Sequence, residues 1–237
     1  MKKTGTLWLI PTPLGDDVPY WLLEQDRQAI LHIRHFVVEA EKTARKHLKA
    51  LGCSVPIREL SLSALNEHTD RRCLPELLQP LLSGHDLGLL SEAGCPAIAD
   101  PGADLVALAH RHNIRVIPLV GPSSILLALM GSGANGQCFT FHGYLPTDRT
   151  ERISRLKYLE ERSTEFNESQ IFIETPYRNQ SLLEDALQKL KPATRLCIAV
   201  NLTLPDQLIV SKPVSDWSQE YPDLRKKPCV FVLYAHS

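Results

Sequence analysis

Residues 90–102 read Leu-Ser-Glu-Ala-Gly-Cys-Pro-Ala-Ile-Ala-Asp-Pro-Gly and follow directly on the short apolar run 86–90. The apolar run predicts a buried strand, and the glycines and prolines after it predict a turn-rich loop. We expect a helix with a leucine stripe next, at 104–112, and then a further apolar strand at 115–120. Strand, loop, helix and strand in this order are typical of α/β proteins with right-handed parallel crossovers.

The same alternation precedes this stretch. Apolar runs at 6–10 and 35–39 predict two earlier strands, and amphipathic segments ending near residue 31 and spanning 42–51 predict two helices. Gly52 is well placed to close the second helix, since glycine adopts the left-handed cap conformation at little cost. We therefore expect a first α/β domain over residues 1–120, with four strands.

A second α/β domain is expected over residues 121–237. Its last strands are close together in sequence, which indicates an antiparallel or mixed sheet. The expected helices are 124–130, 148–161 and 181–190, the segment 161–169 is expected to be a loop, and the expected strands are 138–142, 171–174, 195–200, 207–210 and 229–234.

Composition restricts the class of protein. The chain has 237 residues, of which 43% are hydrophobic and 22% charged, so wholesale disorder is excluded. Its 26 basic residues nearly balance 27 acidic ones. This balance argues against a protein that binds polyanions over most of its surface, but it leaves room for a local basic face. Six scattered cysteines without close pairing predict reduced thiols and no metal site, and no apolar run is long enough for a membrane span. We expect a cytoplasmic protein.

The loops that follow the predicted strands contain the candidate binding residues. Ligands of open α/β sheets bind outside the carboxyl ends of the strands, and here these ends lead into 11–15, 39–41, 91–102 and 121–124. Three of these four loops are rich in glycine and proline, which predicts a small-molecule cradle built from backbone. No G-x-G-x-x-G follows the first strand and no P-loop or G-x-S-x-G motif occurs, so dinucleotide, nucleoside-triphosphate and common hydrolase sites are not indicated.

Residues 90–102 resemble the S-[DE]-A-G-x-P-x-I-x-D-P-G signature of one branch of the tetrapyrrole methylase superfamily. That branch contains the small-subunit ribosomal RNA 2′-O-ribose methyltransferases. Four other stretches also resemble the family and occur in the same order along the chain. They are Ile10-Pro-Thr-Pro-Leu-Gly15, Arg115-Val-Ile-Pro-Leu-Val-Gly-Pro122, Phe141-His-Gly-Tyr-Leu-Pro146 and Glu174-Thr-Pro-Tyr-Arg178. The resemblance covers nearly the whole chain.

The resemblance implies two α/β domains with S-adenosylmethionine in the cleft between them, and a homodimer. Carried over position by position, it implies cofactor contacts at Leu14, Gly94, Cys95, Ile98, Ser123, Ser124, Ile173, Leu202 and Cys229. Backbone carbonyls and apolar walls suit a cationic sulfonium, and methyl transfer by in-line displacement depends mostly on alignment of donor and acceptor.

The acceptor side departs from the family. Its E-D-T-R motif is Glu41-Lys-Thr-Ala44 here, and its E-L-T-K motif is Asn201-Leu-Thr-Leu204. A ribose hydroxyl needs a base to remove its proton, so Glu41 is the candidate catalytic residue, with a helix N-terminal carboxylate as the alternative. Ribosomal RNA, in or out of the small subunit, is the expected acceptor. A tetrapyrrole or other small-molecule acceptor and a non-catalytic S-adenosylmethionine-binding protein stay open.

Other polar residues have two interpretations each. Asp100 is expected to fix its turn or to serve the site, and Glu174 and Arg178 to pair with each other or to act in the site. A run of basic residues on the helix 148–161 faces either RNA or solvent. These basic residues are Arg149, Arg152, Arg155 and Lys157.

Overall fold

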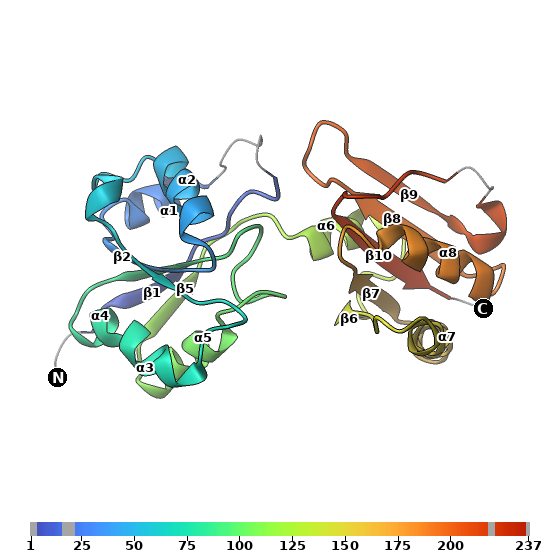
Figure 1. Ribbon diagram of the computed structural model, residues 1–237, viewed down its shortest axis with the longest axis horizontal. Helices are drawn as coiled ribbons and strands as arrows, with labels where there is room; N and C mark the ends of the chain where they lie inside the picture. The colour runs from blue at the N-terminus through green and yellow to red at the C-terminus, as the bar shows by residue number, and fades with distance from the viewer. Residues whose placement is uncertain (1–3, 16–21, 218–220, 236–237) are drawn as a thin grey trace. The chain divides into compact units, whose positions relative to one another are not determined.

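The structure is a computed structural model and describes residues 4–15, 22–217 and 221–235. The chain divides into two compact units, Met1–Ser123 and Ser124–Ser237 (Figure 1). The sequence placed the domain boundary after residue 120, and the division of the structure falls after Ser123. The part of the first expected helix that precedes residue 22 lies outside the described residues.

Unit 1 is built on a five-stranded sheet in the order β3-β2-β4-β1-β5, with every pair parallel. Its strands are β1 Thr6–Leu9, β2 His35–Val38, β3 Ser61–Ala64, β4 Leu87–Leu90 and β5 Arg115–Pro118. Its helices are α1 Glu24–Ile30, α2 Glu41–Leu51, α3 Leu74–Leu77, α4 Gln79–Leu82 and α5 Ala103–Arg111, with short 3₁₀ turns at Ile57–Glu59 and Arg71–Cys73.

Helices cover both faces of this sheet (Figure 1). On one face, Ile30 of α1 and Leu48 of α2 pack with Phe36 of β2 in one apolar cluster. On the other, Leu78 and Leu105 pack with β-strand side chains in a second cluster. Both faces of β4 are therefore buried, which explains why its four residues are apolar or glycine throughout. The expected α/β class and parallel strands are confirmed.

The strand β3 was not expected from the sequence. Its residues, Ser-Leu-Ser-Ala, include no β-branched or aromatic side chain, so strand propensity is weak. It pairs only with β2 and lies at the edge of the sheet, where little of it is buried. The pairing with β2 stabilises this strand despite its weak strand propensity, so the unit has one strand more than predicted.

Unit 2 holds a mixed sheet in the order β6-β7-β10-β8-β9, in which only β6 and β7 are parallel. The strands are β6 Phe139–Tyr144, β7 Ser169–Ile173, β8 Arg195–Val200, β9 Leu208–Pro213 and β10 Cys229–Tyr234. The helices are α6 Ser124–Ser132, α7 Arg149–Phe166 and α8 Asn179–Lys189, with a 3₁₀ turn at Val214–Asp216. The mixed sheet expected from the sequence is confirmed.

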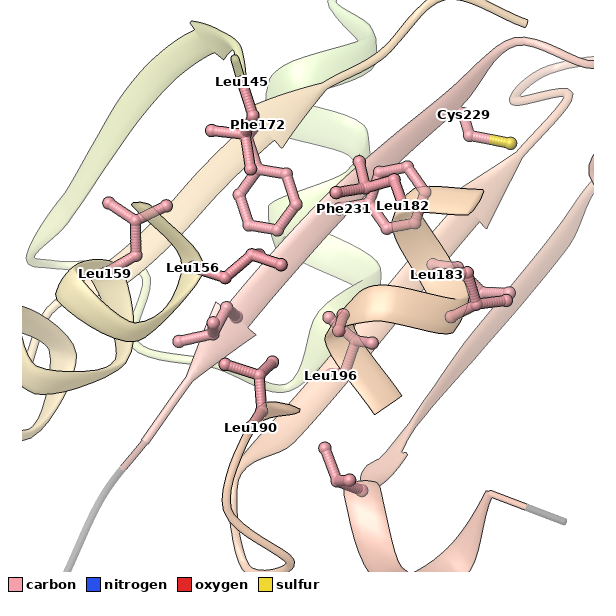
Figure 2. Packing of buried hydrophobic residues seen from close by; sticks show 14 of the residues in the cluster. Leu145, Leu156, Leu159, Phe172, Leu182, Leu183, Leu190, Leu196, Cys229 and Phe231 are labelled. Atoms are coloured by element: carbon pink, nitrogen blue, oxygen red, sulfur yellow. The ribbon is translucent and has the colours of Figure 1, made fainter. Parts of the chain in front are cut away.

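The core of unit 2 lies between the sheet and the helices α7 and α8 (Figure 2). The rings of Phe172 and Phe231 stack in parallel on neighbouring strands, with their centroids 5.6 Å apart. Leu156 and Leu159 of α7 and Leu182 of α8 close over the sheet side chains. Burial of this surface drives the folding of the unit, because apolar area leaves water on both helices at once.

The loop expected at 161–169 is wrong, because α7 continues to Phe166. The polar residues of this segment have partners in the tertiary structure. The buried Glu160 carboxylate accepts from the backbone N–H of Lys191 at 2.7 Å and from the Thr194 hydroxyl at 2.5 Å. The Ser163 hydroxyl accepts from the backbone N–H of Ala235 at 2.8 Å. Glu160 and Ser163 are therefore buried together with hydrogen-bond partners for their side chains.

The prediction that the basic residues of α7 all face RNA or solvent is also wrong in part. Arg152 is only 5% exposed, and its Nη2 lies 2.6 Å from Oδ2 of the buried Asp185 in α8. Arg149 binds the other oxygen of the same carboxylate at 2.8 Å. Both arginines bind Asp185 and so fasten α7 to α8. Arg152 is buried and is not available to RNA, whereas the side chain of Arg149 stays 63% exposed.

Two further observations bear on the expectations. The six cysteines are free thiols, of which Cys197 and Cys229 are buried and Cys73 and Cys138 are exposed. Among the described residues, no helix is both long enough and apolar enough to cross a membrane.

We predict that Asp185→Ala lowers the free energy of unfolding by about 3–5 kcal/mol, because it leaves the buried Arg152 without a carboxylate. Asp148→Ala is the matched control on the same helix pair: it removes the α7 N-cap, whose side chain accepts from the Glu151 N–H, and should cost about 1 kcal/mol. Urea unfolding of both variants measures the difference. Equal losses would contradict the anchoring role of Asp185.

Candidate functional site

Two loops meet at the carboxyl edge of the unit 1 sheet. The chain leaves β1 through residues 10–14, and it leaves the neighbouring strand β4 through the loop 91–102. Thr12 and Gly94 join the loops by two backbone hydrogen bonds, from Thr12 N to Gly94 O at 2.8 Å and from Gly94 N to Thr12 O at 3.1 Å. Thr12 is 1% exposed, so this bridge is shielded from water.

Gly94 has a backbone conformation that would strain any side chain. Its φ of +85° is a conformation that favours glycine, and a Cβ there would lie 3.3 Å from Cδ2 of Leu14. The next residue, Cys95, donates its thiol to the Pro122 carbonyl at 3.3 Å. The structure thus brings Leu14, Gly94 and Cys95 together, beside the segment that leads to Ser123.

The loop 91–102 stores backbone strain. Ala97 and Ala99 have φ values of +65° and +60°, which side-chain-bearing residues rarely adopt, and Gly102 has +132°. Each such alanine costs on the order of 1 kcal/mol or more, and such residues persist only where the surrounding structure fixes them. The loop therefore has a fixed shape rather than the shape its local sequence prefers.

An apolar cavity of about 360 Å³ lies against this loop. Cys95 and Ile98 line it together with Pro11, and the remaining lining residues are also apolar. The lining residues are Leu9, Pro11, Cys95, Pro96, Ala97, Ile98, Ala103, Val106, Pro118 and Leu119. Ile98 is 51% exposed, so an apolar side chain faces solvent at the cavity.

Polar groups of α2 reach the start of the same loop. Thr43 donates its hydroxyl to Oε1 of Glu92 at 3.0 Å, and the backbone N–H of Glu92 donates to Oε2 of Glu39 at 3.0 Å. Glu41 opens α2 and pairs with Nη2 of Arg45 at 2.7 Å, so its carboxylate is engaged along the helix. The segment 41–44 and the loop 91–102 therefore form one region.

Asp100 is the carboxylate most altered by this region. Burial first, and then the negative charges of Glu39 and Glu92, raise the pKa of Asp100 to about 6. Burial disfavours the ionised form, and like charges nearby do the same. Asp100 thus takes up a proton more readily than an ordinary carboxylate, which is a property of groups that exchange protons in active sites.

In unit 2, three expected cofactor residues lie at one edge of the sheet. Ile173 ends β7 and pairs with Val230, while Cys229 starts the neighbouring strand β10. Leu202 follows β8, and the backbone N–H of Asn201 donates to Pro228 O at 3.1 Å beside Cys229. Cys229 and Leu202 are 5% and 6% exposed, so both side chains are buried within the unit. Ser124 is the first residue of α6.

A buried ion pair borders these residues. Glu174 directly follows β7, and its Oε1 accepts from Nη2 of Arg178 and from the Thr175 N–H, each at 2.6 Å. Its side chain is fully buried, and Oε2 has no hydrogen-bond partner among the described residues. The pairing expected from the i,i+4 spacing is confirmed.

Sequence reasoning missed the connection between Glu39, Glu92 and Asp100. Glu39 directly follows β2, and Glu92 is the second residue after β4. This was the available signal, because the ends of adjacent parallel strands meet. The sequence left Asp100 either as a turn residue or as a residue of the site. Its proximity to the two glutamates depends on how the loop folds back, which residue spacing does not reveal.

The fold is shared with methyltransferases of known structure. The chain is similar to the crystal structure of the methyltransferase CobJ, with a TM-score of 0.62 and 17% identity over 98% of this chain and 100% of that one. It is also similar to a uroporphyrin-III-C-methyltransferase from Thermus thermophilus, with a TM-score of 0.52 and 15% identity over 97% of this chain and 92% of that one. At this identity the likeness shows the two-sheet α/β fold of that class of enzyme.

Sequence comparison gives the family. Residues 23–217 match the Tetrapyrrole (Corrin/Porphyrin) Methylases model. The chain is 30% identical to the ribosomal RNA small subunit methyltransferase I of Escherichia coli O157:H7 over 99% of its own length and 79% of the relative's. It is 33% identical to the enzyme of that name from Streptococcus pyogenes serotype M6, over 78% of this chain and 61% of the relative. The chain belongs to the tetrapyrrole methylase family and is a methyltransferase. The methyl donor of this family is S-adenosylmethionine.

We predict that Asp100→Asn raises the free energy of unfolding by about 1 kcal/mol at pH 8, after allowance for solvent screening. The folded state binds the Asp100 proton more tightly than the unfolded state, so the associated stability is present below pH 3.8 and lost as pH rises through about 6. Above that pH the wild type holds a half-buried charge that asparagine lacks.

Urea unfolding at pH 4 and pH 8 tests this. The gain should nearly vanish at pH 4, and the exposed control Asp216→Asn should change little at either pH. A gain of equal size at both pH values would show that the charge of Asp100 is not its cause.

Proposed function

We propose that this enzyme transfers a methyl group from S-adenosylmethionine to a ribose 2′-hydroxyl of ribosomal RNA. The observation that carries the proposal is the strained loop 91–102, held to residues 10–14 by the Thr12–Gly94 bridge beside an apolar cavity. The acceptor is supported by the names of the relatives, which are small-subunit ribosomal RNA methyltransferases. The substrate implies a cytoplasmic enzyme.

The residues present fit the cofactor. Gly94 leaves open a space that a Cβ would fill, and the cavity beside it is apolar. We propose that the unit 1 residues Leu14, Gly94, Cys95, Ile98 and Ser123 contact the cofactor. The resemblance to the family implies further contacts from Ser124, Ile173, Leu202 and Cys229, which belong to unit 2. S-adenosylmethionine supplies an electrophilic methyl group on a cationic sulfonium. The chain's part is to hold the donor in one orientation in a dry pocket, and such alignment is worth about 7–11 kcal/mol of a barrier.

Removal of the hydroxyl proton is assigned to a carboxylate. Asp100 is suited to this as general base, because its raised pKa makes it a stronger base than an ordinary carboxylate while it is still ionised at neutral pH. Glu41, expected from the sequence, is half exposed and paired with Arg45. We assign Glu41 to a contact with the acceptor and Asp100 to the proton.

The departures from the family's acceptor motifs have structural roles here. Ala44 is 3% exposed and packs in the core under α2, so the position does not face a substrate. Asn201 adopts a left-handed φ of +48°, and its Nδ2 donates to Oδ2 of Asp206 at 2.7 Å. Neither position is needed for the proposed base, so the altered motifs are compatible with activity.

We also propose a homodimer. The helix α6 is apolar along its length, and Met130 on it is 79% exposed. A helix with apolar residues on all sides is normally buried, which a second copy of the chain would achieve. Sedimentation of the purified protein reports the mass, and a monomer at all concentrations would contradict this part of the proposal.

Calorimetry tests the donor site. The wild type should bind S-adenosylmethionine, and Gly94→Val should weaken binding at least ~10-fold because the new side chain strains the φ of +85° and presses on Leu14. Gly136→Val is the matched control, since a Cβ at Gly136 meets nothing within 4 Å. Ile98→Lys should weaken binding similarly, because it would place a cation in the apolar cavity proposed for a cationic cofactor, on an exposed side chain that the fold does not need.

The donor assignment fails if the wild type shows no binding at millimolar cofactor. It also fails if Gly94→Val and Gly136→Val bind equally well. Thermal melting of each variant confirms that the fold is intact.

The acceptor is tested with small ribosomal subunits from a strain that lacks the gene. Labelled S-adenosylmethionine and the purified enzyme should add a methyl group that mass mapping places on a ribose 2′-oxygen. The rate should fall as pH drops below about 6, where Asp100 takes up a proton. Asp100→Asn should lower kcat by about 10²-fold or more and remove that pH limb, whereas Glu41→Gln should retain it.

Two outcomes would contradict the acceptor proposal. One is an unlabelled RNA together with label on a tetrapyrrole or another small molecule. The other is cofactor binding without turnover on any cellular RNA fraction, which indicates a binding protein.

A further inference from the structure

A second concave region lies at the amino edge of the unit 1 sheet. Because all five strands are parallel, their first residues meet at this edge, and the loop 91–102 leaves the opposite edge. Thr6 begins β1 opposite Arg115 at the start of β5, and His35 begins β2 opposite Leu87 of β4. His85 and Asp86 stand just before β4.

These strand starts form a groove of about 570 Å³, which we call the amino-edge groove. Five of its lining side chains are basic or can become so. They are His32, Arg34, His35, His85 and Arg115. Its other lining residues are Thr4, Gly5, Thr6, Ile33, Gly84 and Asp86, so Asp86 is its one acid.

The Asp86 carboxylate is already used by the fold. Its Oδ1 accepts from the Thr6 N–H at 2.8 Å, and its Oδ2 accepts from Nε1 of Trp8 at 3.1 Å. His32 Nε2 is also 3.3 Å from Oδ2. These contacts hold one negative charge at the floor of the groove and satisfy it, while both arginines are exposed in the same groove.

The basic side chains are close enough to repel one another. The rings of His35 and His85 lie 5.5 Å apart. Burial first, and then the charges of His85 and Arg34, lower the pKa of His35. Asp86 is the single acid among the lining residues and is already engaged, so a bound anion would meet mainly basic side chains. Arginine and protonated histidine donate charge-assisted hydrogen bonds to phosphate oxygens.

We propose that the amino-edge groove is a second binding site, which takes a phosphate group. A metal ion does not fit, because two arginines line the groove and the described residues include no metal-binding cluster of histidine, cysteine and carboxylate side chains. The phosphate belongs either to a small free anion or to an RNA backbone. The site lies at the opposite edge of the sheet from the methyl-transfer loops, so it is independent of the proposed function.

The test compares the full-length wild type with the double variant Arg34→Ala/Arg115→Ala. Inorganic phosphate is titrated while the histidine ring signals are followed by NMR, and a short single-stranded RNA is titrated by fluorescence anisotropy, both at constant ionic strength. The double variant should bind at least ~10-fold more weakly, because it loses both permanent cations of the groove. Both arginines are exposed, so the fold should survive, as thermal melting will show.

Arg58→Ala is the matched control, since Arg58 is exposed and precedes β3 without lining the groove, and its effect should be under about twofold. Loss of RNA binding in the double variant, with RNA bound more tightly than phosphate, assigns the groove to an RNA backbone. Loss of phosphate binding alone assigns it to a small anion. Equal binding of both probes by the wild type and the double variant overturns the proposal, whatever the methyltransferase assays give.

Discussion

The Thr12–Gly94 bridge is the contact on which the candidate site depends. Strands β1 and β4 lie side by side in the sheet, and without the bridge their following loops would separate where the sheet ends. Two buried hydrogen bonds keep the loops together beyond the ends of these strands. This contact places Leu14 against Gly94 and lets the loop 91–102 hold two alanines in left-handed conformations. A loop held in this way can present backbone to a ligand at little further entropic cost.

At the carboxyl edge of the sheet, the ionised form of Asp100 is electrostatically unfavourable. Burial and the charges of Glu39 and Glu92 act against ionisation of Asp100, although the fold gains no stability from this arrangement. Stability and function often conflict in this way, and strained or destabilised groups gather where chemistry is done. In unit 2, several buried charged groups are instead stabilised by their partners. There the buried charges of Arg152, Asp185 and Glu160 are each matched by partners and serve only to hold helices in place.

The two edges of the unit 1 sheet differ in charge. Carboxylates gather at the carboxyl edge, and histidines and arginines gather at the amino edge. The near-neutral net charge of the whole chain therefore hides a local separation of charge. For an enzyme whose relatives act on ribosomal RNA, local charge is the relevant quantity, because a phosphate backbone responds to the cations within a Debye length.

The sequence by itself determined the α/β class, the parallel first sheet, the mixed second sheet and the family, because apolar periodicity and one long Gly/Pro signature are local properties of the chain. Tertiary structure decided the rest. The strand β3 exists because β2 offers hydrogen bonds, and α7 extends to Phe166 because Glu160 and Ser163 find partners far along the chain. Arg152 left the predicted basic face for the same reason. The pKa of Asp100 and the amino-edge groove both arise from side chains distant in sequence, whose charges interact only once parallel strands have aligned their ends.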